Sequence, residues 1–211
     1  MKKTAIGCGV LLVLGIIVLV IVLIAGGSYN RLVRLAQGVN SQWAQVQNVY
    51  QRRADLVPNL VATVSGAANF EKSTLTEITA ARASVGQMKM DPNNAPSDPA
   101  KLAEFEKVQG ALSSALSRLL VVSERYPDLK SSASFLELQS QLEGTENRIS
   151  VERGRFNDAV QAYNTAIKSF PAVFYAGMFG FAEKPYFAAT AGAEKPPQVQ
   201  FDFNKPAPAK P

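Results

Sequence analysis

The sequence predicts an all-α protein in which an N-terminal transmembrane helix is followed by a long antiparallel helical bundle of three to four helices and an aromatic-rich C-terminal extension. Three observations predict it: an uncharged apolar run near the N-terminus, apolar side chains at helical spacing after it, and a seven-residue apolar repeat in the longest segment. The expected parts are a short N-terminal segment (1–5), the anchor (6–27), the bundle (28–170), the aromatic extension (171–203) and a Pro- and Ala-rich disordered tail (204–211).

Residues 6–25 are expected to cross a lipid bilayer. They contain no charge and no proline, and fifteen of them are Ile, Leu or Val. Twenty helical residues at 1.5 Å each match about 30 Å of hydrocarbon. Insertion is favoured by about 5 to 9 kcal/mol on the biological insertion scale.

Three other interpretations of this run fit less well. Ala25, Gly26 and Gly27 could precede a signal-peptide cleavage site, but the run exceeds the usual length of a signal peptide. The residues before Cys8 look like a lipobox, yet the apolar core follows the cysteine. A buried core helix usually keeps some polar positions, and this run has none.

The basic residues beside the run nearly balance. Lys2 and Lys3 precede it, and Arg31 and Arg34 follow it. The Met-Lys-Lys start resembles that of secreted proteins, so we expect a single pass through the membrane, with the N-terminus inside and the bulk of the chain on the extracytoplasmic side.

The first part of the bundle is amphipathic and contains a proline. Pro58 removes a backbone donor, so we expect either a kink or a boundary between helices 29–57 and 59–86. Met88 to Pro99 is rich in turn residues and predicts a loop. The apolar face consists of Leu32, Leu35, Val39, Trp43, Val46, Tyr50, Leu60, Val64, Leu75, Ile78 and Val85.

A third helix is expected over 99–125. Asp98 can cap it and Pro99 suits its first position, whereas Tyr126 and Pro127 end it. Its apolar face consists of Leu102, Phe105, Val108, Leu112, Leu116, Leu119 and Val122.

The longest helix is expected over 134–170, opened by a capping box of Ser134 and Glu137. Burying its six-residue seam would contribute about 9 to 18 kcal/mol before the cost of ordering the chain. Any face left uncovered would favour association with a second copy. The seam consists of Phe135, Leu142, Ile149, Phe156, Tyr163 and Phe170.

The extension holds nearly half of the aromatic residues. Val199, Phe201 and Phe203 alternate with polar residues, as in a short half-buried strand. The extension either folds back on the bundle or presents aromatics to another subunit or to lipid headgroups. The candidate partner surface is Phe181, Tyr186, Phe187, Phe201 and Phe203.

Composition removes several classes of function. The net charge of +5 comes without a dense Lys/Arg run, so nucleic-acid binding is not expected. With no histidine and only Cys8, a Cys/His metal site, a Cys/His nucleophile and an intrachain disulfide are impossible. We find no cofactor motif and no catalytic motif, and we expect none of these activities.

Two groups of polar residues lie beside the apolar faces. Arg53 or Arg153 could hold an anionic ligand or partner; alternatively, the groups form interhelical bonds that set the register of the bundle. The candidates are Arg52, Arg53, Asp55 and Asn59 near Pro58, and Glu146, Arg153, Asn157 and Asn164 on the longest helix.

Residues that carry a family resemblance are spread over almost the whole chain. They are Tyr29-Asn30, Trp43 to Val46, Tyr50 to Val61, Glu124 to Pro127, Leu129-Lys130, Phe135, Thr145 to Ile149, Arg153, Phe156-Asn157, Tyr163-Asn164, Phe170-Pro171, Gly180-Phe181, Tyr186-Phe187 and Pro197 to Phe203. In this order and spacing they resemble the bacterial LemA family. One departure is Phe70-Glu71, where many members carry His-Glu.

The resemblance implies one membrane anchor, a four-helix bundle and no established enzymatic activity. It also implies a place beside membrane proteases or other envelope proteins, by analogy. We therefore expect a membrane-anchored scaffold of the cell envelope, without catalysis, that binds the bilayer through residues 6–25 and associates with itself or an envelope membrane protein. The alternative is a sensor that uses the polar cluster around Arg53 and Arg153.

Overall fold

The computed structural model describes residues 2–66 and 70–188. All regular secondary structure in these ranges is helical, which confirms the predicted all-α class. The elements are α1 (Lys2–Ser65), α2 (Lys72–Gln87), α3 (Pro99–Ser123), α4 (Pro127–Lys130), α5 (Ala133–Lys168) and the 3₁₀ turns η1 (Ala172–Phe174) and η2 (Gly177–Phe179).

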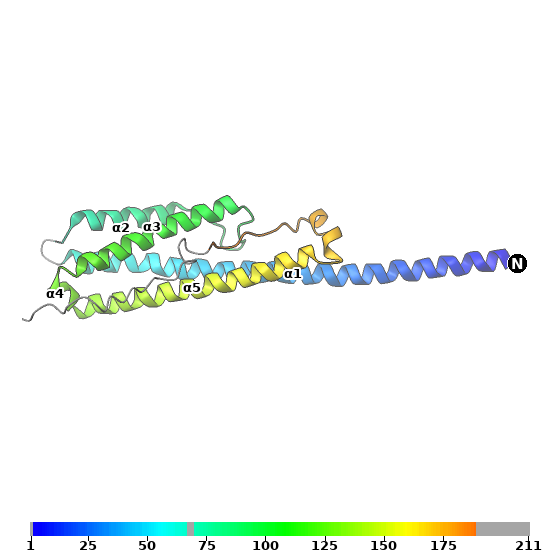
Figure 1. Ribbon diagram of the computed structural model, residues 1–211, viewed down its shortest axis with the longest axis horizontal. Coiled ribbons are helices and arrows are strands. Elements are labelled where there is room, and N and C mark those ends of the chain that lie inside the picture. Colours follow the sequence, from blue (N-terminus) through cyan, green and yellow to red (C-terminus); the bar gives the residue numbers. More distant parts are fainter. Residues whose placement is uncertain (1, 67–69, 189–211) are drawn as a thin grey trace, which may run out of the picture.

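The four long helices lie side by side in an elongated bundle, and α1 continues alone beyond one end (Figure 1). Successive long helices run in opposite directions. The closest pairs are α1 with α5 and α2 with α3. The molecule is therefore two helical pairs packed against each other.

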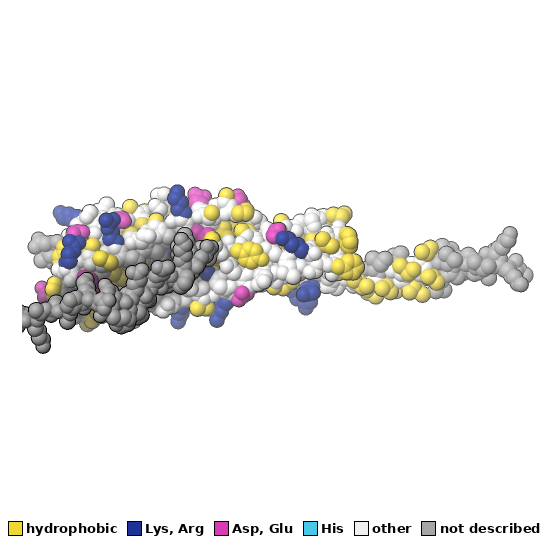
Figure 2. Space-filling model, in the orientation of Figure 1, with side chains coloured by type: hydrophobic (Ala, Val, Ile, Leu, Met, Phe, Trp, Pro, Cys, Tyr) yellow, Lys and Arg dark blue, Asp and Glu magenta, His cyan; other side chains and the backbone are white. Residues whose placement is uncertain are grey.

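The free part of α1 is the predicted anchor. Among the described residues, it is the one helix long and apolar enough to cross a membrane, and its apolar stretch is not buried in the molecule. From Val13 to Ile24, the large apolar side chains whose exposure is described are each about half exposed to solvent. Figure 2 shows these side chains on the helix beyond the bundle.

Of the two alternatives expected at Pro58, a kink or a helix boundary, the structure excludes the boundary, because α1 continues through Pro58. The helix continues to Ser65, and the next one starts at Lys72. Proline at position 58 cannot donate to the carbonyl of Ala54 four residues earlier. The Nε of Arg82 on α2 donates to that carbonyl at 3.1 Å, so it keeps a partner. The expected second helix, 59–86, is thus divided between the end of α1 and α2.

The interior consists of two apolar clusters along the length of the bundle. One surrounds Trp43, Phe105 and Phe156 near the anchor, and the other surrounds Leu112, Leu119 and Phe135 at the far end. The seam of α5 is buried at Phe135, Leu142, Ile149, Phe156 and Tyr163.

The seam prediction is wrong at its last member. Phe170 is 80% exposed, because α5 ends at Lys168 and Phe170 lies beyond the helix. The buried members pack against residues of α1 or α3 in the same chain. Association between copies would therefore have to use other residues.

Two helix starts differ in how well they were predicted. Asp98 caps α3 as expected, with its carboxylate accepting from the backbone N–H of Ala100 at 2.8 Å. The cap of α5 is Ser132 and not Ser134, because the Ser132 hydroxyl accepts from the N–H of Phe135. Pro127 follows the end of α3 and opens the single turn of α4.

The extension folds back on the bundle after η2. Residues 181–188 have no regular secondary structure and lie along α5, where Phe187 enters the apolar cluster around Trp43. The predicted strand 199–203 and tail 204–211 lie outside the described residues.

Candidate functional site

A polar layer separates the two apolar clusters. Its centre is Arg53 of α1, which is 1% exposed. One terminal nitrogen (Nη1) donates to Glu146 Oε1 at 2.8 Å and to the Ser113 hydroxyl, and the other (Nη2) donates to the carbonyl oxygen and side-chain Oε1 of Gln109 at 3.0 and 2.6 Å. The guanidinium also lies 5.0 Å from the centre of the Tyr50 ring. Residues of α3 and α5 thus bond to one buried positive charge that α1 supplies.

Arg153 of α5 forms a second ion pair close to this layer. It contacts Glu106 at 2.7 Å, donates to the carbonyl of Ala188 at 2.9 Å and lies 4.7 Å from the centre of the Phe187 ring. Burial raises the pKa of Glu106, and the positive charge of Arg153 opposes this shift only in part. Burial also raises the pKa of Tyr50, against the lowering effect of Arg153 and Arg53.

Two asparagines of α5 hold the extended chain by its backbone. Asn157 donates to the carbonyl of Phe187 at 3.1 Å and accepts from its N–H at 2.9 Å. Asn164 makes the same pair of bonds with Lys184, at 2.8 and 3.0 Å. We name Arg153, Asn157 and Asn164 the backbone-binding row.

The spacing of these two asparagines explains why both can bind one chain. Seven helical residues advance about 10.5 Å, and three extended residues advance about 10 Å. Positions 157 and 164 on α5 therefore match positions 187 and 184 on the extended chain. Neither pair of bonds involves the side chain of the bound residue, so the asparagines recognise only its backbone groups.

Two cavities follow α5 from the row towards α4; the first lies between α5 and residues 187–188, and the second lies between α3 and α5. One cavity of about 520 Å³ lies beside Ser150, Arg153 and Ala188, and another of about 460 Å³ lies beside Ser117 and Asn147. Glu146 lines both. We name these two cavities the α3–α5 groove. A smaller cavity of about 90 Å³ lies between Arg53 and Arg153.

The structure brings together only some of the predicted polar residues. Arg53, Glu146, Arg153, Asn157 and Asn164 all bond to other elements. Arg52, Asp55 and Asn59 are exposed on α1. Asp55 accepts from Gln51 one turn earlier, at 2.8 Å, and the Asn59 carbonyl accepts from Thr63 at 2.9 Å.

The aromatic candidates also separate. Phe187 is 4% exposed and packs against Trp43 and Phe156, so it offers a partner almost no surface in this arrangement. Phe181 is half-buried, and Tyr186 is 46% exposed. Phe201 and Phe203 lie outside the described residues.

Sequence reasoning missed the contribution of α3 to the polar layer. Gln109 is 5% exposed and lies between Phe105 and Leu112 on the buried face of that helix. A polar residue at a core position of an apolar repeat was the available signal. Ser113 and Glu106 carry no such signal in the sequence, because neither occupies an apolar position of the repeat.

Comparison with known proteins places the chain in a family. The model of the LemA family matches residues 42–201. Similar proteins include protein LemA of Metamycoplasma hominis, 26% identical over 145 residues, which are 68% of this chain and 61% of that protein.

Two magnetosome proteins are also similar. MamQ of Magnetospirillum gryphiswaldense is 31% identical over 93 residues, which are 43% of this chain and 34% of MamQ. MamQ 2 of Paramagnetospirillum magneticum is 31% identical over 87 residues, 41% of this chain and 32% of that protein. The chain thus covers less than two thirds of the length of each of these relatives.

Proposed function

The chain belongs to the LemA family, and from that premise we propose that it is a non-catalytic, membrane-anchored scaffold that binds an extended segment of a protein partner in the α3–α5 groove. The family resemblance in the sequence is confirmed by the match to the family model. The protein is membrane-associated and helical. The partner in this proposal is an envelope membrane protein or a second copy of the chain.

The backbone-binding row is the observation that carries the proposal. Asn157 and Asn164 each satisfy both backbone groups of one residue in an extended chain. A binding mode that depends on main-chain bonds accepts many sequences, as in other sites that capture extended peptides. The groove follows α5 from Ala188 towards α4, and exposed polar groups line it at Ser117, Asn147 and Ser150.

The uninterrupted α1 supports the anchoring part of the proposal. The helix enters the bundle from the apolar stretch without a linker, so the bundle stands at a defined place beside the bilayer. We propose a single pass through the inner membrane, with the bundle on the extracytoplasmic side.

The absence of catalysis is part of the same proposal. The chain has no histidine, and the described part holds no group of three or more Cys, Asp or Glu placed to bind a metal ion. The names of these relatives state no reaction.

A sensor site at the polar layer is the second candidate. Its support is the small cavity beside Arg53, whose buried Nε has no hydrogen-bond partner among the described residues. About 90 Å³ has room for roughly three water molecules at 30 Å³ each. Both guanidinium groups already pair with carboxylates. We therefore favour a role for Arg53 in setting the register of the helices.

Photo-crosslinking in intact cells tests the scaffold. A photoreactive residue at Asn147, which is exposed in the groove, should give one defined product with an envelope protein or a second copy. Ser117→Trp should reduce that product because the indole fills the groove from α3. Ser114→Trp is the matched control, since Ser114 is exposed on the same helix and does not line the groove.

The outcome is decided by the two tryptophan variants. Loss of the product in Ser117→Trp alone supports the groove as the binding site. Equal yields in both variants, or no product from Asn147 at all, would contradict it. Retention of the protein in the membrane fraction checks that each variant is made and anchored.

A further inference from the structure

We propose that the end of the bundle nearest the anchor is a second membrane contact, in which exposed apolar side chains of residues 170–179 insert into the interfacial region of the bilayer that α1 enters. This inference rests on the proposed membrane span. We name the surface the apolar cap. It consists of Phe170, Val173, Phe174, Met178 and Phe179, which are 80, 52, 75, 86 and 62% exposed.

The cap is distinct from ordinary exposed apolar residues. Elsewhere on the described bundle, Val121, Leu136 and Val151 are exposed one at a time, as on most protein surfaces. The cap instead gathers five large apolar side chains within ten residues. A contiguous exposed apolar surface of this kind marks a site of contact with a partner or a membrane.

In this segment the small residues are buried and the large apolar residues are exposed, which reverses the usual pattern of burial. Ala172 and Ala176 are buried against the core, at 2 and 4% exposure, whereas Phe174 and Met178 face outward. Backbone bonds hold the turns in this arrangement, including Ala176 N–H to Ala172 O at 2.8 Å and Phe181 N–H to Ala176 O at 2.9 Å. The segment is therefore built to present its large side chains.

The position of the cap identifies the bilayer as its partner. The ring centres of Phe179 and Phe181 lie 5.4 and 5.5 Å from that of Tyr29 on α1. Tyr29 follows the last residue of the apolar run by four residues, about 6 Å along a helix. The cap thus lies level with the end of the proposed span.

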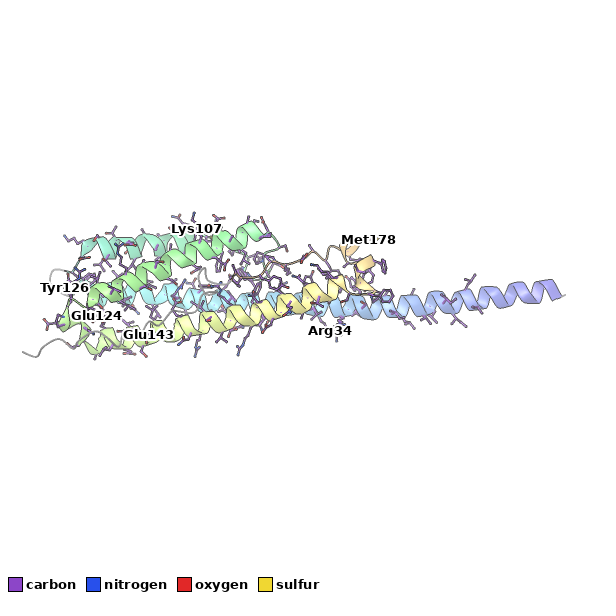
Figure 3. The ribbon with its side chains drawn as sticks, in the orientation of Figure 1. Arg34, Lys107, Glu124, Tyr126, Glu143 and Met178 are labelled. Carbon is purple, nitrogen blue, oxygen red and sulfur yellow. The ribbon has the colours of Figure 1, made fainter. Side chains whose placement is uncertain are left out.

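The figures agree with this placement. Figure 3 shows Met178 at the end of the bundle from which α1 continues alone, with Arg34 on α1 at the same end. On the face drawn in Figure 2, apolar side chains gather at that end and continue onto the free part of α1. The proposed lipid-contacting surface is continuous from the span to the cap.

The residue types also suit an interfacial position. Aromatic side chains concentrate at membrane–water interfaces, and basic side chains there reach the lipid phosphates. Tyr29 is 39% exposed, and Arg31 and Arg34 are exposed within two turns of it. With both α1 and the cap in contact with lipid, the bundle could not swing freely about its anchor.

A fluorescent label on the cap tests the inference. The full chain with Cys8→Ser and Met178→Cys is labelled with the environment-sensitive dye NBD and placed in vesicles of phosphatidylcholine and phosphatidylglycerol. The control label is at Val121→Cys, which is 71% exposed on α3 in the far half of the bundle. Emission at position 178 should shift to the blue and lose intensity in vesicles with brominated acyl chains, and emission at 121 should do neither.

Three results would overturn the inference, and they differ from one another. Equal behaviour of the two labels, in protein that still sediments with vesicles, would place the cap in water while leaving the anchor intact. Protection of position 178 from iodide without quenching by brominated lipid would mean that protein covers the cap. Failure of the protein to sediment with vesicles would remove the proposed span itself. Trp43 emission checks that both labelled chains remain folded.

Discussion

At the scale of single residues, the most consequential feature is a buried positive charge. Arg53 reaches acceptors on α3 and α5, and only Glu146, 41% exposed, retains good access to water. A buried charge adds little net stability while its partners are present, but it imposes a strong requirement on their positions. Arg53 therefore selects the one helix register in which all of its partners coincide.

Replacement of Arg53 by methionine should destabilise the bundle. The change leaves Gln109 buried without its donor, and we expect a loss of about 2 to 3 kcal/mol, less than for a fully enclosed ion pair because water can reach Glu146. Urea unfolding in detergent, followed by the emission of the single tryptophan, Trp43, measures it. Arg52→Met, one residue earlier and exposed, should change stability by less than about 0.5 kcal/mol. Equal effects of the two variants would contradict the role given to Arg53.

Glu106 should make stability depend on pH in a defined direction. Burial raises its pKa above the ordinary value of 4.5. A group that binds its proton more tightly when folded stabilises the protein fully below the unfolded pKa, and this contribution is lost as pH rises through the folded pKa.

The stability of the unmodified protein relative to Glu106→Gln should therefore fall as pH rises from about 4.5 and level off above the raised pKa. Urea unfolding of both chains at a series of pH values measures the difference. A difference that rises over this range would mean that the Arg153 pair outweighs the cost of burial.

At the scale of elements, the continuity of α1 is the main result. A proline inside a helix removes one backbone bond and usually kinks or breaks the helix. Here Arg82 of α2 supplies a replacement donor to the Ala54 carbonyl. One tertiary bond thus helps a single helix run from the proposed membrane span to the far end of the bundle.

A double-mutant cycle tests this explanation. Arg82→Met should cost about 1 kcal/mol in the natural chain, because the Ala54 carbonyl then loses its donor. In the Pro58→Ala background, the alanine N–H can bond to that carbonyl, so the same change should cost measurably less. The free energies of unfolding of the four chains give the coupling. An equal cost in both backgrounds would show that Arg82 does not substitute for the missing bond.

At the scale of the whole molecule, two apolar clusters are joined by a polar layer and attached to one long helix. The arrangement projects the far end of the bundle away from the proposed membrane surface. From Ser28 to Ser65, α1 alone covers about 57 Å at 1.5 Å per residue. Residues on α3 near the far end are therefore useful reporters of the side on which the bundle lies.

Labelling of Val121→Cys should establish that side. In a Cys8→Ser background this is the only thiol, and it lies at an exposed position. We expect a membrane-impermeant maleimide to label it in intact spheroplasts, as the extracytoplasmic orientation requires. Labelling only after the membrane is opened would place the bundle in the cytoplasm.

The sequence predicted most of the fold because helical elements and anchors depend on neighbouring residues. Spacing and residue type were enough to predict the apolar run, the cap at Asp98, the loop after Met88 and most of the buried seam. Only part of the polar site could be predicted from the sequence. Arg53 and Arg153 could be named as candidates, but their partners on α3 could not, since Ser113 and Glu106 do not interrupt any local pattern.

By itself, therefore, the sequence determined the helical class, the proposed anchor and the faces that each helix would bury, because these follow from local periodicity and hydrophobicity. Only the tertiary structure decided the fate of Pro58, the partners of Arg53, the capture of the extended chain by Asn157 and Asn164, and the position of the apolar cap beside Tyr29. Each of these joins residues far apart in the chain, and such contacts exist only once the packing of all the helices has set their register.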